Sequence, residues 1–218
     1  MLTRRIRALV LLALAALIVA PTALGSSRQV SIIYDDGVTV SPDPTVQEIR
    51  HLGVGMVRII VHWADIAPDA GSATRPDFDA SEPGAYPAAN WSATDAAVQA
   101  ATSAGVTVLL TVAGHAPQWA FGRGEPSDPR HLLGAWRPSA SQFGQFVRAV
   151  GTRYSGSFGG LPAVHAWEIY NEPNFGQDLS PQSVGSDLTG ADMYRRLVSA
   201  GWQALQGTGH GGDTILIG

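Results

Sequence analysis

Strand-like and helix-like runs alternate along this chain, and their alternation limits the folds that the chain can adopt. Five apolar runs have the length and β-branched composition of strands, at residues 30–34, 56–61, 106–112, 164–170 and 214–217. Helical patterns lie between them, at residues 43–52, 91–104, 139–154 and 191–206. Repeated strand–helix units build parallel sheets, because each helix carries the chain back to the start of the next strand. The sequence therefore predicts an α/β protein with four strand–helix units and a fifth strand.

The lengths of the loops distinguish two parallel architectures, an open doubly wound sheet and a (β/α)8 TIM barrel. Loops after the second, third and fourth predicted strands are long, whereas loops after the helices are short. Barrels place their functional loops at the carboxyl ends of the strands, so the pattern favours the barrel. With five strands the barrel is incomplete, and an incomplete barrel has unpaired sheet edges. We therefore expect this polypeptide alone to fold poorly or to lack activity.

The amino terminus has the three-part layout of a secretory signal peptide. Arginines at positions 4, 5 and 7 precede thirteen apolar residues, Ala8 to Ala20, and Ala23-Leu24-Gly25 offers the small residues of a cleavage site. A helix made of that apolar run spans about 20 Å, less than the roughly 30 Å hydrocarbon core of a membrane. We assign residues 1–25 to the signal peptide and residues 26–218 to a partial barrel domain. The protein is expected to be secreted, with no stable membrane span after cleavage.

The composition excludes several classes of chemistry. The chain contains no cysteine, so disulfides, thiol catalysis and iron–sulfur clusters are excluded. No two of the six histidines lie four residues apart on a plausible helix, so neither a metal nor an organic cofactor is predicted. Loss of the three signal-peptide arginines takes the formal charge from −4 to −7, because residues 1–25 contain no acidic residue. A domain this acidic is not expected to bind nucleic acid.

A carboxylate follows the fourth predicted strand. The apolar run 164–170 leads directly into Asn171-Glu172-Pro173, and barrel enzymes hold their catalytic groups at the carboxyl ends of the strands. Glycoside cleavage requires an acid that protonates the leaving oxygen and a second carboxylate that attacks or activates water. Partial desolvation at a strand end disfavours the charged form of a carboxyl group, which suits Glu172 to the acid role. The Asn171 amide offers hydrogen bonds to a sugar hydroxyl.

Two segments of the chain carry a family resemblance. Residues 167–174 read Trp-Glu-Ile-Tyr-Asn-Glu-Pro-Asn, and residues 57–68 read Val-Arg-Ile-Ile-Val-His-Trp-Ala-Asp-Ile-Ala-Pro. They resemble the fourth-strand and second-strand patterns of the retaining (β/α)8 glycoside hydrolases, the clan that includes cellulase-like and β-xylosidase-like families. The resemblance covers roughly residues 28 to 218, matches the amino-terminal part of such a barrel and implies a carbohydrate substrate. It also implies that Glu172 is the acid/base, that Asn171 contacts a sugar hydroxyl and that Arg58 supports the nucleophile.

The second carboxylate of such a site is missing from the pattern. In the family that the chain resembles, the nucleophile is a glutamate at the end of the seventh strand. Glu168 precedes Glu172 by four residues, or about 13 Å along a strand at about 3.3 Å per residue. A retaining pair of carboxyl groups lies about 5 to 5.5 Å apart, so Glu168 fails as the nucleophile. Glu168 is expected to be a barrel-interior group with a cationic or hydrogen-bonding partner, and the nucleophile to lie beyond the end of this chain.

Three further residues are weaker candidates for substrate binding. Trp63 and Trp119 lie near predicted strand ends, where indole faces can stack on sugar rings, although tryptophans in long loops also pack into loop cores. His115 follows the third predicted strand and offers a hydrogen bond either to a substrate hydroxyl or within its own loop. We include all three among the predicted substrate-binding residues.

The function predicted from these residues is hydrolysis of O-glycosidic bonds in a polysaccharide or oligosaccharide, with Glu172 as acid/base and no cofactor. A second hypothesis is a non-catalytic carbohydrate-binding protein on a shortened barrel, which keeps the sugar cleft without the second carboxylate. A third is an α/β protein that binds an unrelated small ligand. A strand-end glutamate further along the reading frame separates the first hypothesis from the second, and affinity for sugars separates both from the third.

Overall fold

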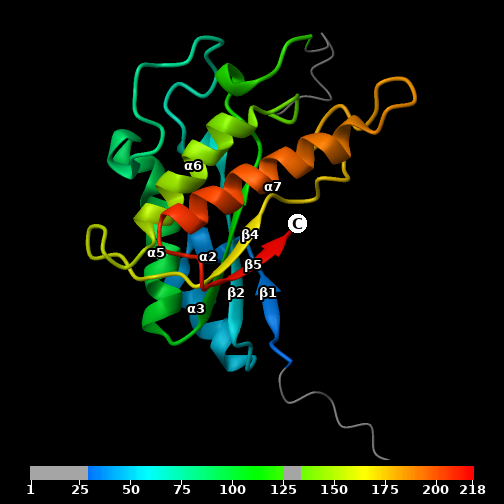
Figure 1. Cartoon of the computed structure of the whole chain (residues 1–218). Helices are drawn as coiled ribbons and strands as arrows, with labels where there is room; N and C mark the ends of the chain where they lie inside the picture. The colour runs from blue at the N-terminus through cyan, green and yellow to red at the C-terminus, as the bar shows by residue number, and fades with distance from the viewer. Residues whose placement is uncertain (1–28, 125–133) are drawn as a thin grey trace, which may run out of the picture. The chain divides into compact units, whose positions relative to one another are not determined.

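The computed structural model describes residues 29–124 and 134–218. The predicted signal peptide, residues 1–25, lies outside the described residues. Residues Ser31–Gly218 form one unit, which contains the helices and strands drawn in colour in Figure 1.

A five-stranded parallel sheet forms the centre of this unit (Figure 1). Its strands are β1 Ile32–Tyr34, β2 Met56–His62, β3 Thr107–Ala113, β4 Ala166–Ile169 and β5 Thr214–Ile217. Each strand pairs with the next one in the sequence, in the order β1-β2-β3-β4-β5. A doubly wound sheet reverses its strand order at a switch point, whereas the wall of a barrel continues in one direction. The strand order confirms the predicted barrel architecture over the part that the structure describes.

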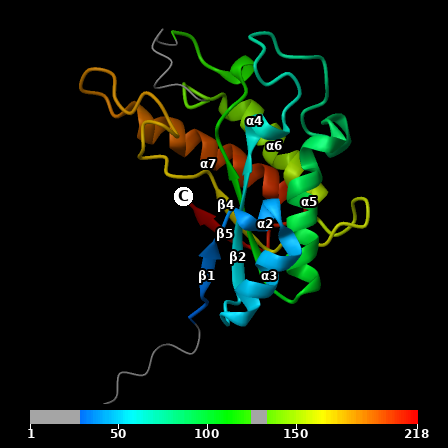
Figure 2. The same cartoon turned by 180° about the vertical axis from the view of Figure 1, so that it is seen from behind.

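Helices follow the first four strands. Their bounds are α2 Gly37–Val40, α3 Pro42–His51, α4 Trp63–Ile66, α5 Ala88–Ser103, α6 Ala140–Arg153 and α7 Thr189–Gly207, with short 3-10 turns η1 Pro83–Ala85 and η2 Gln118–Ala120. Helix α5 packs against β2 and β3 and α7 packs against β4, so these helices lie on one side of the sheet (Figure 1, Figure 2). The sequence pattern predicts the four longer helices but not α2 and α4. Across residues 29–124 and 134–218, none of the helices combines the length and hydrophobicity that crossing a membrane requires.

The two faces of β2 differ in burial, because successive side chains of a strand point to opposite sides. The side chains on the helix face are fully buried, and they are Val57, Ile59 and Val61. The opposite, inner face carries partly buried side chains, which are Met56, Arg58, Ile60 and His62. The polar residues of β2 therefore lie together on the inner face, away from the helices.

Aromatic side chains fill the space between the sheet and the helices. Trp63 stacks on Phe146 with 5.9 Å between ring centroids, and Phe146 stacks on Trp91 at 6.4 Å. All three side chains are fully buried and come from α4, α6 and α5. Burying one Phe side chain stabilises a fold by about 1.5 to 3 kcal/mol, so this stack holds the three helices to one another and to the sheet.

An ion pair with a tyrosine joins α5 to α6. Arg153 Nε donates to Asp95 Oδ1 at 2.9 Å, and the Tyr154 hydroxyl donates to the same oxygen at 2.9 Å. The Arg153 guanidinium also lies 4.7 Å from the ring centroid of Trp91, a cation–π distance. The Asp95 carboxylate is mostly buried, and a buried charge requires hydrogen-bonding partners. Here a cationic donor, Arg153, and a neutral donor, Tyr154, supply them.

Ser139 caps the amino terminus of α6. Ser139 Oγ accepts a hydrogen bond from the backbone N–H of Gln142 at 3.4 Å, which satisfies one of the free donors of the first turn. The reciprocal half of a capping box is absent, because the backbone N–H of Ser139 donates to the Ala120 carbonyl at 2.9 Å instead. The cap therefore also ties the start of α6 to the 3-10 turn η2.

One carboxylate organises the amino ends of β4 and β5. Asp213 Oδ2 lies 3.0 Å from Trp167 Nε1 and 2.7 Å from His210 Nδ1, while Asp213 Oδ1 lies 2.9 Å from His165 Nδ1. His210 Nε2 lies 3.0 Å from the Gly151 carbonyl oxygen of α6. Burial acts to raise the pKa of Asp213, but the hydrogen bonds from these three side chains outweigh it and hold that pKa below its ordinary value.

Replacement Asp213→Ala is expected to lower the free energy of unfolding at pH 7 by about 2 to 4 kcal/mol. It leaves Trp167 Nε1 and His210 Nδ1 buried without an acceptor, and each orphaned group costs about 1 to 3 kcal/mol. Urea unfolding followed by circular dichroism measures the change. Asp77→Ala, at an exposed loop position, is the matched control and should stay within about 0.5 kcal/mol of the parent protein.

The same pair of variants tests the pKa of Asp213. Because the pKa is lowered in the folded protein, the carboxylate stabilises the fold above its ordinary pKa and loses this effect as the pH falls through the folded value. The difference between the parent protein and Asp213→Ala should therefore shrink in acid. A difference that stays constant down to pH 2 would contradict the assigned hydrogen bonds.

Candidate active site

A tight turn follows β4 and carries the predicted acid. The backbone N–H of Tyr170 donates to the Val112 carbonyl at 2.9 Å, which extends the β3–β4 ladder by one residue. Tyr170 and Glu172 then adopt positive φ angles of 73° and 41°. Non-glycine residues seldom adopt this left-handed conformation, and such residues cluster at functional sites. The turn places Asn171 and Glu172 at the carboxyl edge of the sheet.

Tyr170 anchors this turn from below. Its side chain is 1% exposed, and its hydroxyl donates to the Asp178 carbonyl at 2.8 Å. The ring packs against Gly114, where an added Cβ would lie 2.6 Å from the Tyr170 hydroxyl oxygen. Only glycine fits at position 114, and the contact connects the loop after β3 with the turn after β4.

Arg58 connects β2 with β4 on the inner face of the sheet. Its Nε donates to Glu168 Oε2 at 2.7 Å, and its Nη2 donates to Asn171 Oδ1 at 2.9 Å. Thr111 Oγ1 of β3 donates to the same Glu168 oxygen at 2.5 Å. The structure thus confirms that Glu168 has a cationic and a hydrogen-bonding partner, and it brings Arg58 and Asn171 together.

The bond from Arg58 decides what Asn171 can offer a ligand. An amide side chain carries one acceptor oxygen and one donor NH2 group. Since Asn171 Oδ1 accepts from Arg58, its Nδ2 group is left as a donor at the rim of the sheet. A sugar hydroxyl oxygen is a suitable acceptor for it.

Glu172 is exposed, and its carboxylate makes no hydrogen bond or ion pair within the described ranges. The partial desolvation that the sequence analysis expects at this strand end is therefore not supplied by these residues. The physical reason is that the inner face of the sheet is open. Among the described elements β5 is the edge strand, and no strand beyond it covers Glu172.

His115 lies in the loop after β3, next to a second histidine, His62, which ends β2. The rings of His62 and His115 stack with 5.8 Å between centroids and 9° between planes. His62 Nδ1 lies 2.6 Å from the Gly114 carbonyl oxygen, and His115 Nε2 lies 4.0 Å from Asp178 Oδ1. The alternation of side chains along a strand could have indicated that His62 lies on the inner face, because His62 is four residues after Arg58 and every second residue of β2 faces the same side.

Burial is the main cause that lowers the pKa of His115, and the nearby His62 adds to it. The Asp178 carboxylate, a hydrogen bond with the Gln177 backbone and the charge of Asp65 act in the opposite direction and are outweighed. His115 is therefore held toward its neutral form, which can both donate and accept a hydrogen bond.

Trp63 and Trp119 are placed in the core. Trp63 is 0% and Trp119 is 7% exposed, and the two rings meet edge to face at 5.7 Å. Trp119 Nε1 donates to the Pro68 carbonyl at 3.1 Å. Neither indole presents a face on which a sugar could stack, so the predicted stacking role disagrees with this geometry. Trp63 continues the helix-facing parity of Val57, Ile59 and Val61, which explains its burial.

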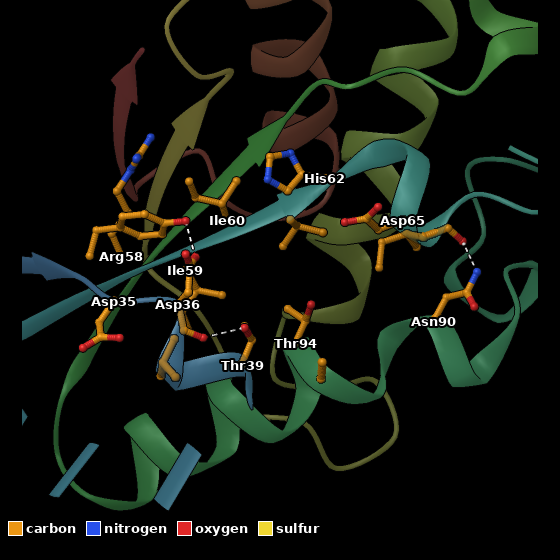
Figure 3. A pocket seen from close by; sticks show the side chains of 15 residues that line it. Asp35, Asp36, Thr39, Arg58, Ile59, Ile60, His62, Asp65, Asn90 and Thr94 are labelled. Atoms are coloured by element: carbon orange, nitrogen blue, oxygen red, sulfur yellow. Dashed lines mark hydrogen bonds between the residues drawn. The ribbon is translucent and has the colours of Figure 1, made fainter. Parts of the chain in front are cut away.

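Two hollows lie beside His62, at the carboxyl end of β2. One has a volume of about 200 Å³ and is bordered by Arg58, His62, Asp65 and Thr94, all labelled in Figure 3. The other is a more open groove of about 630 Å³ above β2 and β3, lined by His62, Asp65, His115, Gln118 and Phe121. Over the described residues, no three His, Cys, Asp or Glu side chains are grouped as a metal ion would require.

No protein-family model and no curated protein matches the sequence. Solved structures do match the fold. A glucosidase from Croceicoccus marinus aligns with a TM-score of 0.57 and 19% identity, over 88% of this chain and 37% of that one. A family 1 β-glucosidase from Thermotoga maritima aligns at 0.51 and 15% identity, over 80% of this chain and 36% of that one. A β-glucosidase from Trichoderma harzianum aligns at 0.51 and 15% identity, over 83% and 36%.

These structures confirm the fold prediction. The described residues have the fold of part of a (β/α)8 barrel, and the chain spans 36% to 37% of the length of these three glucosidases. Five strands of a barrel wall in sequential order agree with that share.

A double-mutant cycle on Arg58 and Glu168 tests the network on the inner face. Arg58→Ala is expected to lower the free energy of unfolding by about 2 to 3 kcal/mol, because the Glu168 side chain, only 15% exposed, loses its cation. Arg58→Ala with Glu168→Ala should cost less than the sum of the two single changes, with a coupling of about 1 to 2 kcal/mol. Urea unfolding measures all four proteins.

The exposed pair of Arg196 and Asp192 on α7 provides the control cycle. Its coupling is expected to be smaller, since solvent screens exposed ion pairs. Equal coupling in the two cycles would show that Arg58 does not hold Glu168 in the way described.

Proposed function

We propose that this chain forms part of a glycoside hydrolase barrel, in which Glu172 is the acid/base for cleavage of O-glycosidic bonds. The observation that carries the proposal is the network from Arg58 to Asn171, which holds the Asn171-Glu172 pair at the carboxyl edge of β4. That edge is where (β/α)8 enzymes hold their catalytic groups. The glucosidase folds that align with the chain support the same reading.

Each residue has a role in this proposal. Glu172 protonates the leaving oxygen and then, as a carboxylate, takes a proton from the attacking water. Asn171 donates a hydrogen bond from Nδ2 to a sugar hydroxyl. Arg58 acts through its bonds to Asn171 and Glu168, so it positions the site rather than touching the reacting atoms. His115 contributes a second hydrogen bond to the sugar.

The proposal requires a second carboxylate. Glu168 is engaged by Arg58 and Thr111 and lies four residues before Glu172 on the same strand segment, so it does not meet the spacing of a retaining pair. We assign the nucleophile to barrel strands outside the residues described. Reading the gene downstream of codon 218 checks this assignment, and a strand-end glutamate two strand–helix units further on is the expected result.

Replacement Glu172→Gln tests the acid/base role in the protein expressed from its complete reading frame. Turnover of 4-nitrophenyl β-glucoside is expected to fall by about 10² to 10⁴, the usual contribution of a general acid or base. A 2,4-dinitrophenyl glucoside needs little help from an acid, so its first step should survive, and added azide should restore turnover by replacing the water that needs a base. A spectrophotometric assay measures both substrates.

Glu48→Gln, at an exposed position of α3, is the matched control and should keep full turnover. Unchanged turnover in Glu172→Gln would refute the proposed role. Affinity for β-glucosides without any turnover in the parent protein would instead favour the non-catalytic carbohydrate-binding protein.

We also propose that the protein is secreted. The support is the arginine-led apolar run within residues 1–25. Amino-terminal sequencing of protein recovered from the culture medium is expected to start near residue 26. Protein that stays in the cells and begins at Met1 would contradict export.

A further inference from the structure

Two histidines from neighbouring strand ends form a pair on the inner side of the sheet. His62 ends β2, and His115 lies in the loop that follows β3. Their rings are 5.8 Å apart and inclined by 9°, so they are stacked. Both line the groove of about 630 Å³ above β2 and β3. Figure 3 shows His62 above β2, on the side of the strand opposite Thr94.

The backbone determines the tautomer of His62. Its Nδ1 lies 2.6 Å from the Gly114 carbonyl oxygen, which can only accept a hydrogen bond. Nδ1 therefore carries the proton, and Nε2 of the neutral ring is an acceptor. The same bond holds the peptide that leads into His115, so His62 constrains His115 through both the backbone and the stacked ring.

The part of the groove that the structure describes is poor in positive charge. Its side chains among the described residues include Asp65 but neither lysine nor arginine. Arg58 lies on the same face of β2, but its guanidinium is engaged by Glu168 and Asn171. Within residues 29–124 and 134–218, the charged groups that face His115 are Asp65 of α4 and Asp178 of the loop after β4, together with His62.

We propose that His62 and His115 act as one hydroxyl-binding pair, which selects an uncharged saccharide unit over a uronate, and that His62 is the positioning residue of the pair. The inference rests on the proposed function and adds the class of substrate. The neutral His115 ring carries one donor and one acceptor, and His62, whose Nδ1 proton is bound to the Gly114 carbonyl, offers Nε2 as an acceptor, a combination that suits sugar hydroxyls. Among the described residues of the groove, a uronate carboxylate would meet Asp65 and no arginine, and a carboxylate without a partner is costly to desolvate.

Burial and His62 lower the pKa of His115, which supports this selectivity. Protonation would turn the pair into a cation and favour an anionic sugar. Binding of a uronate should therefore strengthen only as the pH falls through the pKa of His115, below its ordinary value of 6.5. Binding of an uncharged sugar should weaken over the same range.

Nuclear magnetic resonance of the imidazole nitrogens tests the pair without any assay of activity. In the parent protein we expect the His62 proton on Nδ1 and a His115 pKa below 6.5. His62→Gln should raise the pKa of His115, whereas His51→Gln, at the exposed end of α3, should leave it unchanged. The positioning role would be overturned by a His62 proton on Nε2, or by a His115 pKa that is the same in His62→Gln as in the parent protein. Either result would hold even if the protein is a hydrolase.

Calorimetric titration with methyl β-glucoside and methyl β-glucuronide tests the selectivity. The parent protein at pH 7 should bind the glucoside more tightly than the glucuronide. His62→Gln should weaken glucoside binding about five-fold, the effect of one hydrogen bond of about 1 kcal/mol. His51→Gln should bind as the parent does. If His62→Gln does not fold, the parent protein still decides the matter through its preference between the two sugars.

The outcomes separate this inference from the proposed function. Equal affinity for the two sugars, or a preference for the glucuronide at pH 7, overturns the selectivity while leaving hydrolysis in place. A parent protein that binds neither sugar overturns the proposed function and the saccharide class together, and the titration of His115 then decides the positioning role alone.

Discussion

The bonds of the Arg58 guanidinium are the interaction on which the candidate site depends. They connect β2 with Glu168 inside β4 and with Asn171 beyond its end. A charge on the inner face of a sheet needs partners, and here the partners are the residues that lead to Glu172. Satisfying one partly buried cation therefore also places the proposed acid. A lysine would supply charge at this position but not the two directed bonds.

The alternation of strand side chains separates packing from chemistry in this fold. On β2 the buried aliphatic side chains face the helices, while Arg58 and His62 face inward. The two ends of the strands differ as well. At the amino ends Asp213 is enclosed by hydrogen-bond donors and serves stability, and at the carboxyl ends Glu172 is exposed. This division is the usual one in barrels, where the carboxyl ends carry function.

The fold could be predicted from the sequence because it depends on local patterns. Apolar runs of strand length, helical runs between them and long loops at one end are enough to indicate sequential parallel strands. The strand Thr214–Ile217 agrees with the prediction to the residue. The short helices α2 and α4 could not be predicted, since four residues contain too little periodicity to register.

For the site, the sequence was sufficient to identify Glu172 and Asn171 as candidates, because they follow an apolar strand at the end where barrels hold their catalytic groups. Arg58 became a candidate through the family resemblance of residues 57–68. It could not tell that Trp63 and Trp119 are buried, that Glu172 is exposed or that His62 stacks on His115. Those facts depend on loops that fold back over other loops and on neighbouring strands in register. Such contacts join residues far apart in the chain, and a pattern read along one segment holds no information about them.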